Sequence, residues 1–205
     1  MQSKKKPQPT SITLIEAIRQ DNQRAWNRFV RLYTPLVYSW CRNLGLKADD
    51  VSDIAQDVFV AVHRSIYSFK PNQKASGAFR SWLWGITRNK IQDHHRTHGH
   101  KANGKGGTDF HNLIQQVQEE DEPETVDGLH PRQILLQSAF EILEKEFNEP
   151  TWLCFKKMAV EGQTAREIGE VLDMSPKAVR QAKFRVTKKL RVLLEDDFPD
   201  LTSPS

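Results

Sequence analysis

The sequence predicts an all-α protein built from two small helical domains that are joined by a flexible linker. Apolar residues recur about every three to four positions through most of the chain, as they do on the buried face of a helix, and no strand pattern of useful length is present. A Gly- and Lys-rich stretch followed by an acidic polar stretch separates the two helical parts. The 205 residues suffice for one or two domains that each bury a core.

The two domains are expected to be flanked by terminal tails. Residues 1–10 are polar and contain consecutive lysines, and residues 198–205 follow the last expected helix, so both are predicted to be disordered. The first domain is expected to span residues 11–98 and the second residues 131–197. A flexible acidic linker is expected over residues 99–130.

Charge is distributed unevenly along the chain, although the net charge of +4 is modest. Six Lys or Arg and one acid lie in residues 80–105, and seven Lys or Arg and no acid lie in residues 175–191. Residues 119–127 hold six acids and no base. This layout predicts a partner with two anionic contact regions.

The two cysteines indicate a reducing compartment. Cys41 and Cys154 lie far apart and outside any CxxC spacing, as expected of buried free thiols in the cytosol. No apolar run follows the Lys-rich N-terminus, so the sequence predicts neither a secretory signal nor a membrane span. We therefore expect a soluble cytoplasmic protein that needs no cofactor.

The first domain is predicted to consist of helices over residues 13–19, 25–44, 49–65 and 78–96. Ser11 or Thr13 can cap the first helix, and Pro35 should bend or locally break the second. Residues 68–77 contain proline, asparagine and glycine, which indicates a loop.

The helix over residues 49–65 has two different faces. Its core stripe consists of Val51, Ile54, Ala55, Val58 and Val62. The opposite side carries Asp53, Gln56, Asp57, Val60 and Arg64, with Phe59 at its edge. Both a solvated face and a polar-rimmed protein contact are compatible with this pattern.

The helix over residues 78–96 combines aromatic and basic side chains. The expected core side consists of Phe79, Trp82, Leu83 and Ile86, and the other side of Trp84, Arg88, Ile91 and His95. An exposed ring beside cations suits unpaired bases, whereas packing of Trp84 on a neighbouring helix is the alternative. His94, His95, His98 and His100 lack a second ligand set at a familiar spacing, so solvated or phosphate-contacting histidines are favoured over a zinc site.

The second domain is predicted to contain a helix-turn-helix over residues 164–191. Thr164 and Glu167 have the spacing of a capping box, and Ser175 can cap a second helix that begins at Pro176. A helix capped by Thr151 and another over residues 134–147 are expected before it. In the second helix of the motif the core stripe is Val179, Ala182, Val186, Leu190 and Leu193, and the opposite face is basic. A basic face of this kind predicts DNA reading, and a solvated basic surface is the alternative.

Three motifs, in this order, resemble those of the small two-domain extracytoplasmic-function sigma factors of bacterial RNA polymerase. The run Asp53-Ile-Ala-Gln56-Asp57-Val-Phe59 is similar to region 2.2, and the run from Phe79 through Trp82 and Arg88 to Asn89 is similar to region 2.3 continuing into 2.4. Glu167-Ile168-Gly169, with Ser175, Val179 and Arg185, is similar to region 4.2. The resemblance covers nearly the whole chain outside the tails.

The resemblance implies binding surfaces and no catalytic site, so the protein is not expected to be an enzyme. Core polymerase would be bound by Asp53, Gln56, Asp57, Phe59 and Val60. The −10 element would be bound by Arg80, Trp84, Arg88, Asn89, Lys90 and His95, with the loop 68–77 helping to capture a flipped base. The −35 element would be bound by Arg166, Ser175, Lys177, Arg180, Gln181, Lys183, Phe184, Arg185 and Lys188. The second domain would also contact the polymerase flap, the linker would thread the nucleic-acid channel, and an anti-sigma factor is a further expected class of partner.

Two positions depart from the family pattern, and two other functions compete with it. Asp173 stands where the turn usually has glycine, and Ala178 replaces a frequent threonine. A stand-alone transcriptional regulator with a helix-turn-helix is the main alternative, and a metal-dependent nuclease that uses the histidine cluster is the second.

Overall fold

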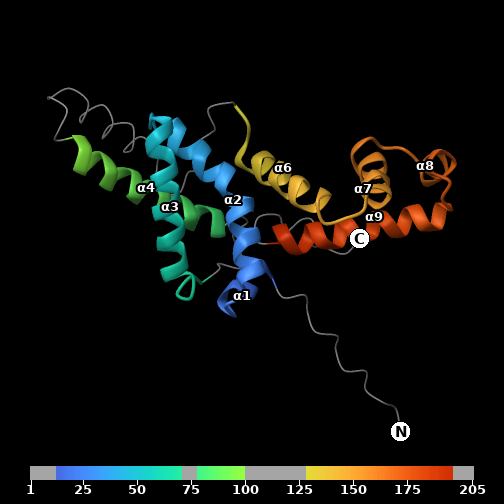
Figure 1. Ribbon diagram of the computed structural model, residues 1–205, viewed down its shortest axis with the longest axis horizontal. Helices are drawn as coiled ribbons and strands as arrows, with labels where there is room; N and C mark the ends of the chain where they lie inside the picture. The colour runs from blue at the N-terminus through green and yellow to red at the C-terminus, as the bar shows by residue number, and fades with distance from the viewer. Residues whose placement is uncertain (1–12, 71–77, 100–127, 196–205) are drawn as a thin grey trace, which may run out of the picture.

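The computed structural model describes residues 13–70, 78–99 and 128–195, and every regular element in these ranges is a helix (Figure 1). The all-α prediction is therefore confirmed for the described part of the chain. The helices are α1 (Leu14–Arg19), α2 (Gln23–Asn43), α3 (Ala48–Ser65), α4 (Ala78–Gly99), α6 (Pro131–Glu144), α7 (Glu149–Phe155), the π-helix η1 (Lys156–Val160), α8 (Ala165–Leu172) and α9 (Pro176–Leu194). The predicted tails, the acidic stretch of the linker and the interior of the loop 68–77 lie outside the described residues.

The first helical part is organised around α2, which packs against α1, α3 and α4. The ring of Phe29 is fully buried there, with its centroid 5.9 Å from that of Phe59 and 5.6 Å from that of Phe79. The indoles of Trp40 and Trp84 pack 5.4 Å apart between α2 and α4. Aromatic side chains bury large apolar areas, so these contacts hold the part together.

Local capping explains where the first two helices begin. Thr13, one of the two residues predicted to cap the first helix, forms a capping box with Glu16 at the start of α1. The Asn22 side chain accepts hydrogen bonds from the backbone N–H groups of Arg24 and Ala25 at 3.0 and 3.1 Å, which starts α2. A bend or a local break was expected at Pro35, which is exposed; the helix continues through this residue, so no break occurs there.

The second helical part contains α6 to α9. Asn148 caps α7, because its Oδ1 accepts a hydrogen bond from the Thr151 N–H at 3.2 Å. The prediction that Thr151 is the cap was wrong, since this residue lies inside α7 and is buried. The helical stretch after α7 ends at Gly162, whose φ of +73° suits glycine.

The two helical parts pack against each other. Helix α6 lies on α2, and one continuous hydrophobic cluster includes Ile18 of α1, Ile134 of α6 and Leu193 of α9. A smaller cluster formed by Cys154, Ala165, Ile168, Val179 and Ala182 lies under the helix-turn-helix. Helix α9 therefore contributes its first half to the small cluster and its last turns to the large one, and Figure 1 shows it running from α8 back towards α2.

Both cysteines are buried free thiols in the structure. Burial raises the pKa of Cys41 to about 12, so this side chain stays protonated at neutral pH. In the described ranges no helix is both long and apolar enough to span a membrane.

Candidate functional site

Side-chain hydrogen bonds cap the N-termini of both helices of the helix-turn-helix, α8 and α9. The Thr164 N–H donates to Glu167 Oε2 at 2.8 Å, and the Glu167 N–H donates to Thr164 Oγ1 at 3.3 Å. The bond from the Thr164 N–H, together with one that the Thr164 hydroxyl donates to Glu167 Oε2 at 2.8 Å, keeps the pKa of Glu167 below its usual value, because both stabilise the carboxylate. At the N-terminus of α9, Ser175 Oγ accepts a hydrogen bond from the Ala178 N–H at 3.2 Å, so both predicted caps are present.

The turn between the two helices depends on Asp173 and Gly169. Asp173 adopts the left-handed conformation with φ 51° and ψ 47°, which aspartate tolerates better than most residues. The Met174 N–H donates to the Gly169 carbonyl at 2.9 Å. A Cβ atom on Gly169 would collide with the carbonyl oxygen of Met174, so only glycine lets α8 and the turn approach this closely.

Helix α9 separates a buried stripe from an exposed basic face, as the sequence predicted. The predicted core positions, Val179, Ala182, Val186, Leu190 and Leu193, are all buried. Among the residues expected to bind DNA, exposed side chains belong to Arg166, Ser175, Lys177, Arg180, Gln181, Phe184, Arg185 and Lys188, and Lys183 is half-buried. Exposed Arg and Gln on one helix face can make paired hydrogen bonds to base edges in a major groove.

Two of these basic side chains also make contacts within the protein. Arg166 Nε lies 3.1 Å from Glu170 Oε1, so its charge is partly balanced. Arg185 Nη2 donates to the buried Thr151 hydroxyl at 3.4 Å, which ties α9 to α7. Phe184, on the same face, is apolar and 66% of it is exposed, which is unusual for a large aromatic residue.

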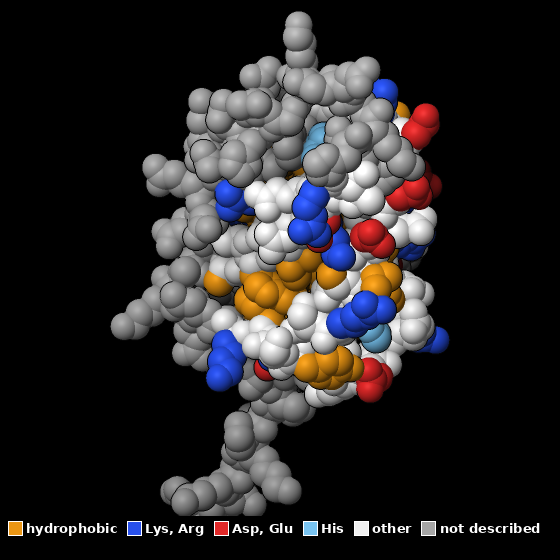
Figure 2. Space-filling view, turned by 90° about the vertical axis from the view of Figure 1, so that its left-hand side faces the viewer, with side chains coloured by type: hydrophobic (Ala, Val, Ile, Leu, Met, Phe, Trp, Pro, Cys, Tyr) orange, Lys and Arg blue, Asp and Glu red, His pale blue; other side chains and the backbone are white. Residues whose placement is uncertain are grey.

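The polar face of α3 is exposed as expected, with one exception. Asp53, Gln56 and Asp57 are exposed, and Val60 is 47% exposed among them. Figure 2, which views the molecule from the side of α3 and α4, shows acidic side chains along one edge with hydrophobic side chains near them. Phe59 was predicted to join this face, but only 9% of it is exposed and its ring meets Phe29 edge-on, so it belongs to the core.

Helix α4 corrects the prediction for Trp84. The indole is 1% exposed and packs on Trp40, so it cannot stack on an unpaired base without leaving the core. Ile91 is fully buried as well, although it was expected on the outer side. Trp82, which was expected in the core, is only half-buried, with its ring centroid 4.9 Å from that of Phe69.

The other residues of α4 expected at the −10 element differ in exposure. Arg80 is 8% exposed, so little of this side chain faces solvent, and its contact with DNA stays a prediction. Asn89 is exposed, and Arg88, Lys90 and His95 are half-buried. Burial, and then the neighbouring charge of His94, lowers the pKa of His95, which favours its neutral form at pH 7. No group of metal ligands occurs among the residues that the structure describes.

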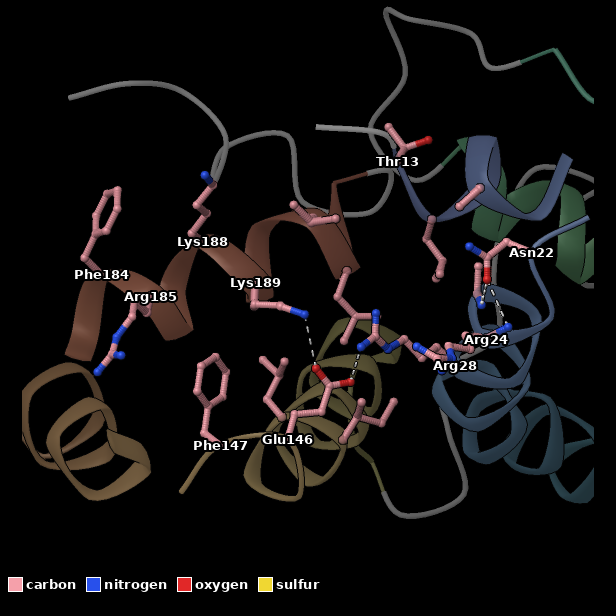
Figure 3. Close-up of a pocket in the computed structure, with 17 residues that line it drawn as sticks. Thr13, Asn22, Arg24, Arg28, Glu146, Phe147, Phe184, Arg185, Lys188 and Lys189 are labelled. Carbon is pink, nitrogen blue, oxygen red and sulfur yellow. Dashed lines mark hydrogen bonds and ion pairs between the residues drawn. The ribbon is translucent and has the colours of Figure 1, made fainter. Parts of the chain in front are cut away.

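A cleft between the two helical parts was not predicted from the sequence. It has a volume of about 760 Å³ and is lined by residues of α1, α2, α6 and α9 and of the turn after α6. Glu146 lies at its wall, with Oε1 2.6 Å from Arg28 Nη2 and Oε2 3.5 Å from Lys189 Nζ, and Figure 3 shows the two cations directed at this carboxylate. Phe184 and Lys188 line the same cleft. A sequence pattern could not reveal it, because the cleft arises from packing between distant segments.

Comparisons with known proteins agree with the motifs. Residues 29–101 match Sigma-70 region 2. The sigma factor SigE of Mycolicibacterium smegmatis is 28% identical over 185 residues, which cover 90% of this chain and 67% of SigE. The sigma factor CnrH of Cupriavidus metallidurans is 27% identical over 192 residues, with 93% and 97% covered, and ShbA of Streptomyces griseus is 29% identical over 190 residues, with 87% and 92% covered.

A solved structure of CnrH in complex with the cytosolic domain of CnrY also matches, with 26% identity, 90% of this chain and 96% of that chain covered, and a TM-score of 0.35. The family assignment rests on the sequence relatives and on the match to region 2. Together with the helix-turn-helix they support an extracytoplasmic-function sigma factor, and the protein functions as an RNA polymerase sigma factor in transcription initiation.

Proposed function

We propose that the two helical parts divide the work of a sigma factor between them. The first part, α1 to α4, binds core RNA polymerase through the exposed face of α3 and recognises the −10 element through α4 and the loop before it. The second part, α6 to α9, binds the −35 element as a duplex through α9. A bacterial core polymerase and promoter DNA are thus the partners, and an anti-sigma factor stays a prediction.

The observation that carries this proposal is the presence of two exposed surfaces of opposite character on one chain. The face of α3 presents Asp53, Gln56 and Asp57 around an exposed valine, as a polar-rimmed protein contact does. Helix α9 presents a basic face without an acid, which suits a polyanion. A stand-alone regulator would need only the second surface.

The protein would act by binding and not by catalysis. Extruding a base from a duplex costs about a few kcal/mol. A site that accepts only the extruded base converts binding energy into strand separation, so no covalent bond in the protein or the DNA has to form or break. Because the polymerase and the chromosome are its partners, we place this activity in the cytoplasm.

Mixing the purified chain with core polymerase tests the proposal. Co-elution of the two proteins, together with transcription that depends on both promoter elements, is the expected result. Specific binding to duplex DNA without any affinity for core polymerase would overturn it and favour the stand-alone regulator. If core polymerase is bound, mapping transcript starts after overexpression of the protein would identify the −10 and −35 elements and their spacing.

The substitution Asp57→Arg is expected to weaken binding to core polymerase and to spare DNA binding by α9. The residue is exposed on α3, so the change places a cation in the proposed contact without disturbing the core. Affinity for core polymerase is measured by fluorescence anisotropy, and salt dependence of the loss would show its electrostatic origin. Glu141→Arg, the same charge reversal at an exposed position of α6, is the control. Equal losses in both variants would contradict the assignment.

The substitution Arg180→Ala is expected to relax recognition at one position of the −35 element. If the exposed guanidinium reads a base edge, its loss costs about 1 to 3 kcal/mol at that base pair and little elsewhere. Competition binding with single-base variants of the promoter measures the effect, and Lys145→Ala, which removes an exposed cation outside α8 and α9, serves as control. A uniform loss on every sequence would instead identify a phosphate contact.

A further inference from the structure

Arg19, the last residue of α1, holds the chain where it leaves α3. Its Nε donates to the Ile66 carbonyl at 3.0 Å, and its Nη2 donates to the Phe69 carbonyl. Ile66 caps the C-terminus of α3, where backbone carbonyls lack helical partners and a cation is favoured. One guanidinium therefore joins α1 to both ends of the turn that follows α3.

A second bond ties the same two segments together. The Tyr67 hydroxyl donates to Asp21 Oδ1 at 2.5 Å, directly after α1. Asp21 has a φ of 56°, a conformation that few non-glycine residues adopt. The turn after α1 thus faces residues 66–69. Tyr67, in the turn after α3, is anchored by this bond although 53% of the residue is exposed.

Residues 66–69, which Arg19 and Asp21 hold, also contact α4. The Phe69 ring is buried, and its centroid lies 5.3 Å from that of Phe79 and 4.9 Å from that of Trp82. Phe79 and Trp82 belong to the first turns of α4. Residues 66–69, the described start of the connection between α3 and α4, are consequently held by α1 and packed on α4.

We propose that Arg19 is a positioning residue for −10 recognition, acting through the carbonyls of Ile66 and Phe69. This inference rests on the proposed function, in which α4 recognises the −10 element, because Phe69 joins residues 66–69 to the first turns of α4. The role depends on the planar fork of arginine, because two donors with fixed relative directions reach two carbonyls at once, whereas a lysine ammonium is a point donor on a flexible stem. Arg19 itself touches neither the polymerase nor the DNA.

The test uses holoenzyme assembled from the full chain and core polymerase, with a fluorescent single-stranded −10 oligonucleotide as probe. Arg19→Lys keeps the charge and removes the fork, and Tyr67→Phe removes the second bond. Both are expected to weaken oligonucleotide binding about tenfold and to reduce the ratio between the best and worst base at the captured position. Affinity for core polymerase should stay within twofold of the unaltered protein, and Arg31→Ala, an exposed arginine of α2, is the matched control.

The outcomes separate this inference from the proposed function. Unaltered binding and base preference in Arg19→Lys and Tyr67→Phe would overturn the positioning role while leaving the sigma-factor function intact. An equal loss of core binding and oligonucleotide binding would also overturn it, because that pattern indicates general unfolding. Failure of the unaltered holoenzyme to bind any −10 oligonucleotide would overturn the proposed function itself, and the positioning role with it.

Discussion

Replacing Gly169 with alanine is expected to lower the free energy of unfolding of the helix-turn-helix by about 3 kcal/mol, at the upper end of the usual cost of overpacking. The added Cβ would collide with the carbonyl oxygen of Met174. A backbone atom cannot rotate away as a side chain can, so the turn around Asp173 would have to move. Helix α9 would then shift relative to α8, and binding to the −35 duplex should fall together with stability.

Gly85→Ala in α4 is the matched control for this prediction. It too lies inside a helix, but nothing lies within 4 Å of the place its Cβ would occupy. Alanine should therefore stabilise α4 by about 0.5 to 1 kcal/mol, since glycine loses more backbone entropy in a helix. Urea denaturation followed by circular dichroism compares the two variants. A midpoint for Gly169→Ala that equals that of the unaltered protein would contradict the close approach of α8 and its turn.

The helix-turn-helix could be predicted in detail because its determinants are local. Thr164 and Ser175 cap helices through hydrogen bonds to residues three positions ahead, so spacing alone identifies them. The left-handed Asp173 likewise follows from its place between two helices. The buried stripe of α9 was also correct, because that helix packs on one side only and its period of about 3.6 residues separates core from solvent.

Predictions failed where neighbouring helices cover a helix on more than one side. Helix α4 packs against both α2 and α3, so Trp84 and Phe79 are buried although the sequence pattern placed them on different sides. Phe59 is buried beside the exposed Val60 for a related reason, because its ring reaches Phe29 of α2. The ion pair between Glu146 and Arg28 was missed because the two residues lie in different helical parts, and only tertiary packing brings them together.

The substitution Trp84→Ala is expected to lower the free energy of unfolding by about 4 kcal/mol, the usual cost of removing a buried indole. The ring is 1% exposed and fills the space between α2 and α4 against Trp40. Calorimetry of the full chain should therefore show a much lower midpoint, and binding to core polymerase should be lost together with binding to a −10 oligonucleotide.

Trp84→Phe distinguishes a core role from a role in base stacking. Phenylalanine keeps most of the apolar contact, and it removes an indole N–H that has no hydrogen-bond partner in the described residues, so its cost in stability should be small. Oligonucleotide binding should then stay normal. Trp82→Ala provides the comparison, because that ring is half-buried and packs on Phe69 at the end of the α3–α4 connection. A Trp84→Ala protein that kept its stability and lost only oligonucleotide binding would show that the indole leaves the core to meet DNA.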